Sequence, residues 1–355
     1  MKSITANKST IHFNKACYKS LNQHIKYKNF SNIFILVDEN THTYCLPLVL
    51  EQLETYCTIE IIELESGEIH KTIETCLGIW NTLSDLNGDR KSLLINVGGG
   101  VITDLGGFVA STFKRGIAYI NIPTTLLSMV DASVGGKTGV DLGTLKNQIG
   151  VVSVPDLVLV DTNFLKTLPQ NQMRSGLAEM LKHGLISSPS YWNQFKDLAT
   201  QSLDDLDALI YESILIKKQV VDADPFEANI RKTLNFGHTL GHAIESYCLS
   251  HPQKETLLHG EAIAIGIVMA SYISTQLTGF SMETCLEIKQ RFHSFYGVVS
   301  FDESEYVPIL ELMKFDKKNH HGNINFVLLE AIGTPKIDCL VEESILIDAF
   351  KFYAT

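Results

Sequence analysis

The chain has 355 residues, of which 45% are apolar and 19% charged, a balance typical of a globular protein too long for one ordinary core. Its formal net charge of -11 argues against a general nucleic-acid binder, which normally presents a basic face. The seven cysteines form no CxxC motif, the N-terminus lacks the apolar core of a signal peptide, and the apolar stretch 262–273 is too short to span a membrane. We therefore expect a cytoplasmic protein with two domains.

The first half of the chain alternates short β-branched runs with helical patterns such as residues 71–83. Alternation of this kind predicts βαβ units and a Rossmann-like parallel sheet with helices on both faces. The segment around Pro155 reads as the last strand of this half. The expected strands are residues 32–37, 58–62, 93–97, 117–122 and 151–160.

The second half carries mainly helical spacing, and strand signals nearly vanish until residues 325–329. The pattern changes near residues 161–169. We therefore predict an α/β N-terminal domain over residues 1–165 and a mostly α-helical C-terminal domain over 166–355, with the active site in the interdomain cleft. The expected helices are residues 173–185, 203–221, 233–247 and 259–277.

A glycine-rich segment, GGGVITDLGG, follows the strand at 93–97 directly. Glycines in this place let the backbone approach a phosphate group, and the next helix offers free N–H groups. The match to GxGxxG is poor, because Thr103 stands where the third glycine belongs. The segment therefore indicates a phosphate site, with a simple tight turn as the alternative.

A second cluster, residues 121–150, contains Thr124 and Thr125 after a strand, two lysines and many glycines. This composition indicates a loop that encloses an anion. A P-loop is a weak interpretation, because Asp131 stands where that motif requires a glycine. At the end of the first predicted strand, Asp38 suits either a ribose hydroxyl or a helix cap, and the residues alone leave both open.

The segment NFGHTLGH places His238 and His242 four residues apart on one helical face, with glycines beside them that leave room for a ligand. A catalytic zinc typically takes three His or carboxylate ligands. Spacing favours this pair and leaves the third ligand open among Glu179, His183 and His259. The pair Lys317 and Lys318 reads as a solvated turn, with a phosphate clamp as the alternative.

These segments resemble the 3-dehydroquinate synthase family, within the sugar-phosphate cyclases. The resemblance covers nearly the whole chain, because many motifs occur in the family's order. They are SGEIHK, GGGVITDLGGFVASTFKRG, IPTTLLSMVDASVGGKTGVD, KNQIG, FLKTLP, GLAEMLKHG, LNFGHTLGHAIE and HGEAIAIG.

The resemblance implies a homodimer that uses NAD and zinc, or cobalt, and in which Arg115 enters the neighbouring subunit's site. It implies the metal ligands Glu179, His238 and His259, gives His183 no ligand role, and brings one of Lys317 and Lys318 to the substrate phosphate. The implied NAD contacts are Asp38, Asn40, Glu68, Lys71, Gly99, Gly100, Asp104, Thr124, Thr125, Asp131, Lys137, Lys146 and Thr167. The implied catalytic and substrate-binding residues are Asp131, Lys137, Asn147, Lys182, Lys217, Arg231, Asn235 and His242, together with Arg115.

The family's activity is the conversion of 3-deoxy-D-arabino-heptulosonate 7-phosphate to 3-dehydroquinate and phosphate in the shikimate pathway, which leads to chorismate and aromatic amino acids. The implied sequence is transient oxidation by NAD, elimination of phosphate, reduction, ring opening and intramolecular aldol closure. Three alternatives are another sugar-phosphate cyclase, a metal- and NAD-dependent alcohol or glycerol dehydrogenase, and an inactive NAD-binding regulator. The set Lys217, Arg231, Asn235 and His242 favours the first activity over all three.

Overall fold

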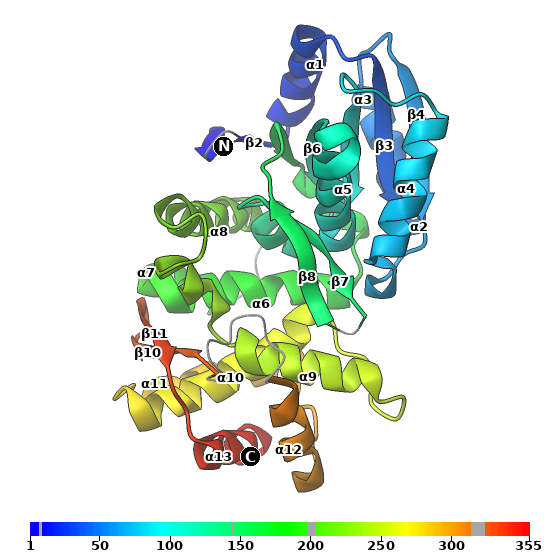
Figure 1. Ribbon diagram of the computed structural model, residues 1–355. Coiled ribbons are helices and arrows are strands. Elements are labelled where there is room, and N and C mark those ends of the chain that lie inside the picture. The colour runs from blue at the N-terminus through cyan, green and yellow to red at the C-terminus, as the bar shows by residue number, and fades with distance from the viewer. Residues whose placement is uncertain (7–8, 144, 197–202, 314–323) are drawn as a thin grey trace. The chain divides into compact units, whose positions relative to one another are not determined.

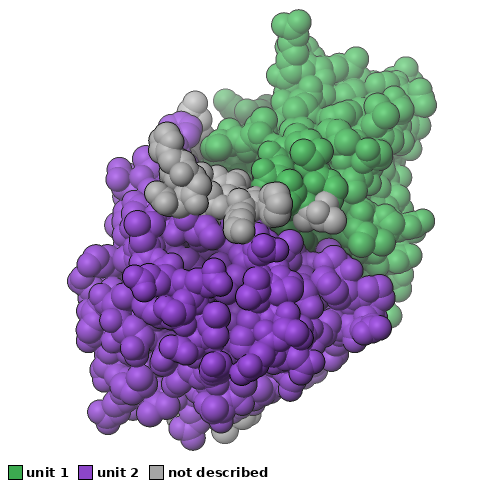
Figure 2. Space-filling view, turned by 60° about the horizontal axis from the view of Figure 1, so that its bottom comes forward, with its two compact units in different colours: residues 1–169 green, residues 170–355 purple. Residues whose placement is uncertain are grey.

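The computed structural model describes residues 1–6, 9–143, 145–196, 203–313 and 324–355 (Figure 1). The chain divides into two compact units, Met1–Pro169 and Gln170–Thr355, which are coloured separately in Figure 2. Each unit has its own secondary-structure class. The predicted order of an α/β half followed by a helical half is confirmed.

The first unit is built on a seven-stranded sheet in which every neighbouring pair is parallel except β1 and β2. Four strands lie where β-branched runs predicted them, namely β3, β4, β5 and β6. The spatial order is β1 (Ile4–Ala6), β2 (Ser9–Phe13), β9 (Leu157–Val160), β6 (Ala118–Pro123), β5 (Leu93–Gly98), β3 (Asn32–Asp38) and β4 (Thr58–Leu64).

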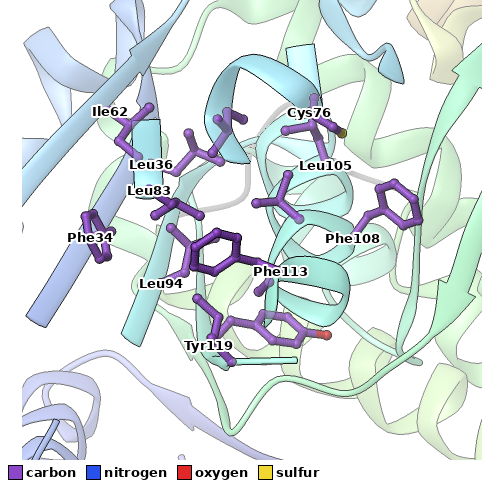
Figure 3. Close-up of a cluster of buried hydrophobic side chains, with 14 of the residues drawn as sticks. Phe34, Leu36, Ile62, Cys76, Leu83, Leu94, Leu105, Phe108, Phe113 and Tyr119 are labelled. Carbon is purple, nitrogen blue, oxygen red and sulfur yellow. The ribbon is translucent and has the colours of Figure 1, made fainter. Parts of the chain in front are cut away.

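Successive side chains of a strand point to opposite faces, so the buried central strands present apolar side chains on both faces of the sheet. Helices cover both of these faces. On one face Phe34 of β3 and Leu94 of β5 pack against α4 (Ile73–Asp85) and α5 (Gly100–Thr112), as Figure 3 shows. The intervening Ile33, Ile35 and Val37 are equally buried. The remaining helices of this sheet are α1 (Ala16–Lys28), α2 (Glu39–Tyr44) and α3 (Leu46–Gln52).

The predicted strand at 151–160 is wrong in its bounds. Its first two residues end β8 (Leu145–Val152), which pairs with β7 (Lys137–Leu142) in an antiparallel hairpin, and its last four form β9. Gly139 and Gly150 face each other in this hairpin, and a Cβ on either would lie within 2.4 Å of a backbone oxygen of the other strand. Val151, Val152 and Val154 obscured the break that Pro155 makes between two different sheets.

The second unit is helical, with a small antiparallel pair of strands near its end. Helix α10 packs against α6, α9, α11 and α13, and it is the central helix of this unit. The elements are α6 (Gln170–Ser187), α7 (Pro189–Asn193), α8 (Leu203–Ala223), α9 (His238–Ser250), α10 (His259–Leu277), α11 (Met282–Tyr296), α12 (Glu303–Leu312), β10 (Phe326–Ala331), β11 (Thr334–Cys339) and α13 (Glu343–Ala354).

Helix α10 extends the apolar stretch at 262–273 to 19 residues and so reaches the length and hydropathy of a membrane span. Within the described residues, 72% of its apolar window is buried inside the protein. Burial of this kind is typical of a core helix of a globular unit.

Candidate functional sites in the two units

The first unit gathers its predicted nucleotide residues at the carboxyl ends of β3, β5 and β6. Because these strands are parallel neighbours, their ends share one edge of the sheet, where open α/β sheets bind ligands. The Thr124 N–H donates to the Gly98 carbonyl at 3.0 Å, and a Cβ on Gly99 would lie 3.0 Å from Thr125 Cγ2. Two strand-end loops therefore touch at the start of α5.

The start of α5 suits a phosphate group. Gly99 precedes the helix, and as a glycine it offers no side chain to cap the first N–H groups. A helix N-terminus of this kind attracts anions through its N–H groups and its dipole. The residues present therefore fit the phosphates of a dinucleotide.

Asp38 at the end of β3 forms a helix cap in this structure. Its Oδ1 accepts a hydrogen bond from the Thr41 N–H at 2.8 Å, and the Thr41 hydroxyl bonds back to the Asp38 N–H at 2.9 Å. Of the two interpretations left open by the sequence, the cap is thus present. Asn40 is exposed in the first turn of the same helix, α2.

A polar cluster joins the hairpin β7–β8 to α5 and to the segment before α4. Lys71 Nζ donates to Asp104 Oδ2 at 2.7 Å and to Asn147 Oδ1 at 2.8 Å. Lys146 Nζ lies 3.0 Å from Glu68 Oε1. The sequence predicted these five residues as site residues, and the structure brings them together. We call them, with Asp141, the hairpin cluster.

Asp141 is the member of the hairpin cluster that sequence reasoning missed. Its Oδ1 accepts the Asn147 N–H at 2.6 Å, and its own N–H donates to the Lys71 carbonyl at 2.9 Å. These bonds hold Asn147 at φ 52°, a left-handed conformation that asparagine tolerates. No sequence signal marks Asp141 beyond its place in the polar segment 137–147.

Burial and charge act in opposite directions within this cluster. Burial disfavours the charged form of Lys71, but the charges of Asp104 and Glu68 outweigh it and raise the pKa of Lys71. Burial also raises the pKa of Asp104, against the attraction of Lys71. The cation of the pair is therefore the more firmly ionised partner.

Four other predicted residues of the first unit lie outside the hairpin cluster. Asp131 is in a π-helical turn (Ser128–Ala132), a rare element frequent at functional sites, and Lys137 begins β7. Thr167 ends a 3₁₀ turn (Thr162–Thr167), where its hydroxyl donates to the Phe164 carbonyl. Arg115 is exposed and has φ 69°.

The second unit brings together the candidate metal ligands of three helices. Glu179 lies on α6, His238 and His242 lie on α9, and His259 begins α10. Glu179 Oε1 is 3.5 Å from His238 Nε2 and 4.0 Å from His259 Nε2. The three histidines also converge, with one nitrogen from each lying within 4.8 Å of the others.

These groups fit a small divalent cation. Two ligands of a tetrahedral zinc with bonds of about 2.0–2.1 Å lie about 3.4 Å apart, close to the observed separations. Glu179 Oε1 is fully buried and has no hydrogen-bond partner among the described residues, which is costly for a carboxylate oxygen. A cation between the carboxylate and the two histidines would satisfy it. Geometry alone leaves His242 as a further candidate.

The glycines beside the histidines leave room for α10, not for a ligand as the sequence suggested, since a Cβ on Gly241 would lie 2.7 Å from Ile263 Cδ1. A Cβ on Gly266 of α10 would lie 2.0 Å from the Gly237 carbonyl oxygen at the start of α9. A Cβ on Gly260 would lie 2.0 Å from the Ser175 carbonyl oxygen of α6. Backbone-to-backbone contact at these glycines brings together the three helices that carry the candidate ligands.

Lys182, Lys217 and Arg231, three more predicted residues of the second unit, are buried, whereas Asn235 is half-buried. Lys182 forms an ion pair with Glu179, one turn earlier on α6. Lys217 of α8 and the side chain of Arg231 are buried, and Arg231 Nη1 donates to the Pro225 carbonyl at 2.6 Å. Lys317 and Lys318 lie outside the described residues.

Sequence reasoning missed three carboxylates or hydroxyls beside these residues. Glu227 accepts a hydrogen bond from Asn235 Nδ2 at 2.6 Å, and Ser213 Oγ lies 2.7 Å from His183 Nδ1. Glu245 Oε2 lies 3.1 Å from His259 Nδ1. Of the three, only Glu245 could have been predicted from the sequence, because it continues the helical spacing of His238 and His242.

Comparison with known proteins agrees over both units. The 3-dehydroquinate synthase N-terminal family matches residues 61–175, and the 3-dehydroquinate synthase C-terminal family matches residues 176–319. A 3-dehydroquinate synthase of Parabacteroides distasonis is 43% identical over 326 residues, which are 91% of this chain and 92% of the relative.

Two solved structures illustrate the similarity in fold. A 2-deoxy-scyllo-inosose synthase, solved with carbaglucose-6-phosphate, NAD+ and Co2+, has a TM-score of 0.86 at 23% identity and covers 99% of both chains. A 2-epi-5-epi-valiolone synthase from Streptomyces hygroscopicus, solved with NAD+ and Zn2+, has a TM-score of 0.82 at 22% identity and covers 100% of this chain and 98% of its own. The fold is therefore shared with these cyclases, and by the sequence matches the chain belongs to the 3-dehydroquinate synthase family.

Proposed function

We propose that this enzyme converts 3-deoxy-D-arabino-heptulosonate 7-phosphate to 3-dehydroquinate and phosphate, with NAD bound by the first unit and a divalent metal ion by the second. The convergence of Glu179, His238 and His259 carries this proposal, because it offers a metal seat beside buried cations. When bound, NAD takes up and returns a hydride while the metal ion polarises the substrate's hydroxyl and carbonyl oxygens.

The buried cations of the second unit fit the two anionic groups of this substrate. Lys182, Lys217 and Arg231 are exposed by only 1%, 6% and 3%. Burying a cation is costly unless an anion compensates it, and a phosphate and a carboxylate would add to anions already present, such as Glu179 beside Lys182. Arginine suits them particularly, because its planar fork can bind two oxygens at once.

Hydrogen bonds fix the orientation of polar groups on the substrate side. Asn235 directs its amide nitrogen to Glu227, so its carbonyl oxygen is oriented the other way. The Arg231 N–H donates to Asp224 Oδ2 at 3.1 Å, which fixes the backbone that carries the guanidinium. We propose that His242, on the same face of α9 as His238, contacts the substrate, and that Asp131, Lys137 and Asn147 lie near the reacting carbons.

The nucleotide contacts are proposed from the first unit's strand ends and hairpin cluster. Gly99, Gly100, Thr124 and Thr125 would surround the phosphates at the start of α5. The remaining proposed contacts are Asp38, Asn40, Glu68, Lys71, Asp104, Asp131, Lys137, Lys146 and Thr167.

One assay tests the activity. Purified protein is incubated with the heptulosonate phosphate, NAD and zinc or cobalt, and phosphate release and dehydroquinate formation are followed together. Equal amounts of both products, without net NADH, are expected. Stoichiometric NADH accumulation would indicate a dehydrogenase, and turnover only with another sugar phosphate would indicate a different cyclase.

The ligand choice is tested separately by metal analysis. His259→Ala is expected to abolish metal retention, whereas His183→Ala is expected to keep the metal, because His183 bonds Ser213 of α8. Equal metal loss in both variants would show that the ligand set is wrong.

We also propose a cytoplasmic homodimer in which Arg115 reaches the partner's site. All seven cysteines are free, which suits a reducing compartment. Lys114 and Arg115 both have left-handed backbone, at φ 47° and 69°, and such strain often occurs at functional sites. Mixing inactive Arg115→Ala with inactive His259→Ala protein should restore turnover, and no recovery would place Arg115 in its own subunit's site.

A further inference from the structure

We propose that Glu245 is a positioning residue for the metal ligand His259, and this inference rests on the metal site of the proposed function. The Nδ1–H of His259 donates a hydrogen bond to Glu245, and this bond directs the unprotonated Nε2 toward Glu179 and His238. Glu245 does not itself touch the metal or the substrate.

The geometry places a carboxylate on each side of the His259 ring. Glu245 Oε2 lies 3.1 Å from Nδ1, and Glu179 Oε1 lies 4.0 Å from Nε2. The first distance is that of a direct hydrogen bond, and the second leaves space for a small cation. A neutral His259 ring can donate to Glu245 and also bind a cation only with its proton on Nδ1 and its lone pair on Nε2.

His238 shows the same arrangement by another route. Its Nδ1 lies 3.3 Å from the Phe236 carbonyl oxygen, and its Nε2 lies 3.5 Å from the same Glu179 oxygen. Both histidines therefore have an acceptor at Nδ1 and face Glu179 through Nε2. Metal-binding histidines typically donate their second N–H to such an acceptor, which fixes the tautomer and ring orientation.

The position of Glu245 on α9 follows from helical spacing. Glu245 is seven residues after His238 and three after His242, so all three share one face of the helix. Its side chain is held in a buried place, since only 8% of the residue is exposed. Substitution can remove the acceptor of His259, whereas the backbone acceptor of His238 cannot be removed in this way.

The test compares metal affinity among purified full-length variants. Zinc binding to unmodified protein, Glu245→Ala and Glu245→Gln is measured by competition with a chromophoric chelator, without substrate or NAD. Loss of an outer acceptor typically costs 10–100-fold in metal affinity, so we expect about this loss in Glu245→Ala. Glu245→Gln keeps a neutral acceptor oxygen at the same place and should recover a large part of the affinity.

A matched control removes the carboxylate of a pair in the other unit. Asp156 Oδ2 lies 2.9 Å from His24 Nε2 in the first unit, so Asp156→Asn makes a similar chemical change in a unit that carries none of the candidate metal ligands. This variant should bind zinc like the unmodified protein. The visible spectrum of the cobalt-loaded protein should change in Glu245→Ala and stay unchanged in Asp156→Asn.

The outcomes separate this inference from the proposed activity. Unchanged zinc affinity in Glu245→Ala, or no zinc binding by the unmodified protein, would overturn the positioning role. Tight zinc binding that weakens in Glu245→Ala, together with no formation of dehydroquinate, would refute the proposed activity and support the positioning role. A lower unfolding temperature with unchanged zinc affinity would show that Glu245 only stabilises the fold.

Discussion

Replacing Gly266 by alanine tests whether close helix contact builds the metal site. The new Cβ would lie 2.0 Å from the Gly237 carbonyl oxygen and 2.8 Å from the Gly241 nitrogen. Since such atoms rarely approach within about 3 Å, α9 and α10 must separate by about 1 Å. Both opposing atoms belong to the backbone, so no side-chain rotation relieves the clash.

The expected loss is large for the addition of one methyl group. Overpacking a well-packed interior costs about 1–3 kcal/mol, and the backbone contact places Gly266→Ala near about 3 kcal/mol. In a unit of this size about 1 kcal/mol lowers the melting temperature by about 2–4 °C, so a decrease of about 6–12 °C is expected. Metal affinity should fall at least about tenfold, because metal–ligand distances tolerate only about 0.2 Å.

Gly78→Ala is the matched control for thermal unfolding and zinc titration. Gly78 lies within α4, and nothing lies within 4 Å of a Cβ placed on it. Alanine there should stabilise the protein by about 0.5–1 kcal/mol, since glycine is a poor helix former, and should leave metal affinity unchanged. If Gly266→Ala melted and bound zinc like the unmodified protein, the close contact would not determine the site.

Three further substitutions test other features. Lys71→Met leaves the carboxylate of Asp104 without its buried cation, so we expect a loss on the order of 3 kcal/mol in denaturant unfolding, largely recovered when Asp104→Leu is added. Burial of Asp224 opposes its ionisation, but three backbone N–H groups, one from Arg231, donate hydrogen bonds to the carboxylate and lower its pKa. The contribution of this carboxylate to the free energy of unfolding is therefore present above about pH 4 and is lost as the pH falls through the lowered pKa. The melting temperature of Asp224→Asn should therefore lie below that of the unmodified protein at pH 7, and the gap should close in acid; a constant gap would refute the linkage. Lys114→Gly should not lower the melting temperature, because its left-handed backbone suits glycine, and a loss above about 1 kcal/mol would show that this turn is unstrained.

The central strands were predictable because they are buried on both faces and therefore form continuous apolar runs. Strands β3, β5 and β6 appear where such runs lie, whereas the edge strand β4 was predictable from its β-branched residues. The edge strand β1, its neighbour β2 and the hairpin β7–β8 carry polar residues, and the hairpin also carries glycines, so none of them contains a long apolar run. The parallel pairing of β2 with β9 joins segments that are distant in the chain, which composition does not reveal.

The candidate site was predictable where residue type and spacing are both restrictive. The histidines of α9 follow helical spacing, and the glycines directly after β5 stand where open α/β sheets typically bind phosphate groups. The role of the glycines beside His238 and His242 was wrongly predicted, since a glycine that accommodates a helix has the same sequence pattern as one that accommodates a ligand. Asp141 and Glu227 were missed because their partners are set by tertiary structure alone.

The glycine contacts among α6, α9 and α10 also bear on which ions the enzyme can use. Contacts between backbones deform little, so the distances between Glu179 and the two histidines are fixed already in the metal-free protein. A rigid seat of this size favours ions with nitrogen bonds of about 2.0–2.1 Å and disfavours Ca2+, whose oxygen bonds are about 2.3–2.6 Å. Ion choice in this enzyme would then follow from ionic radius and rigidity, so that zinc and cobalt exchange readily while larger ions are excluded.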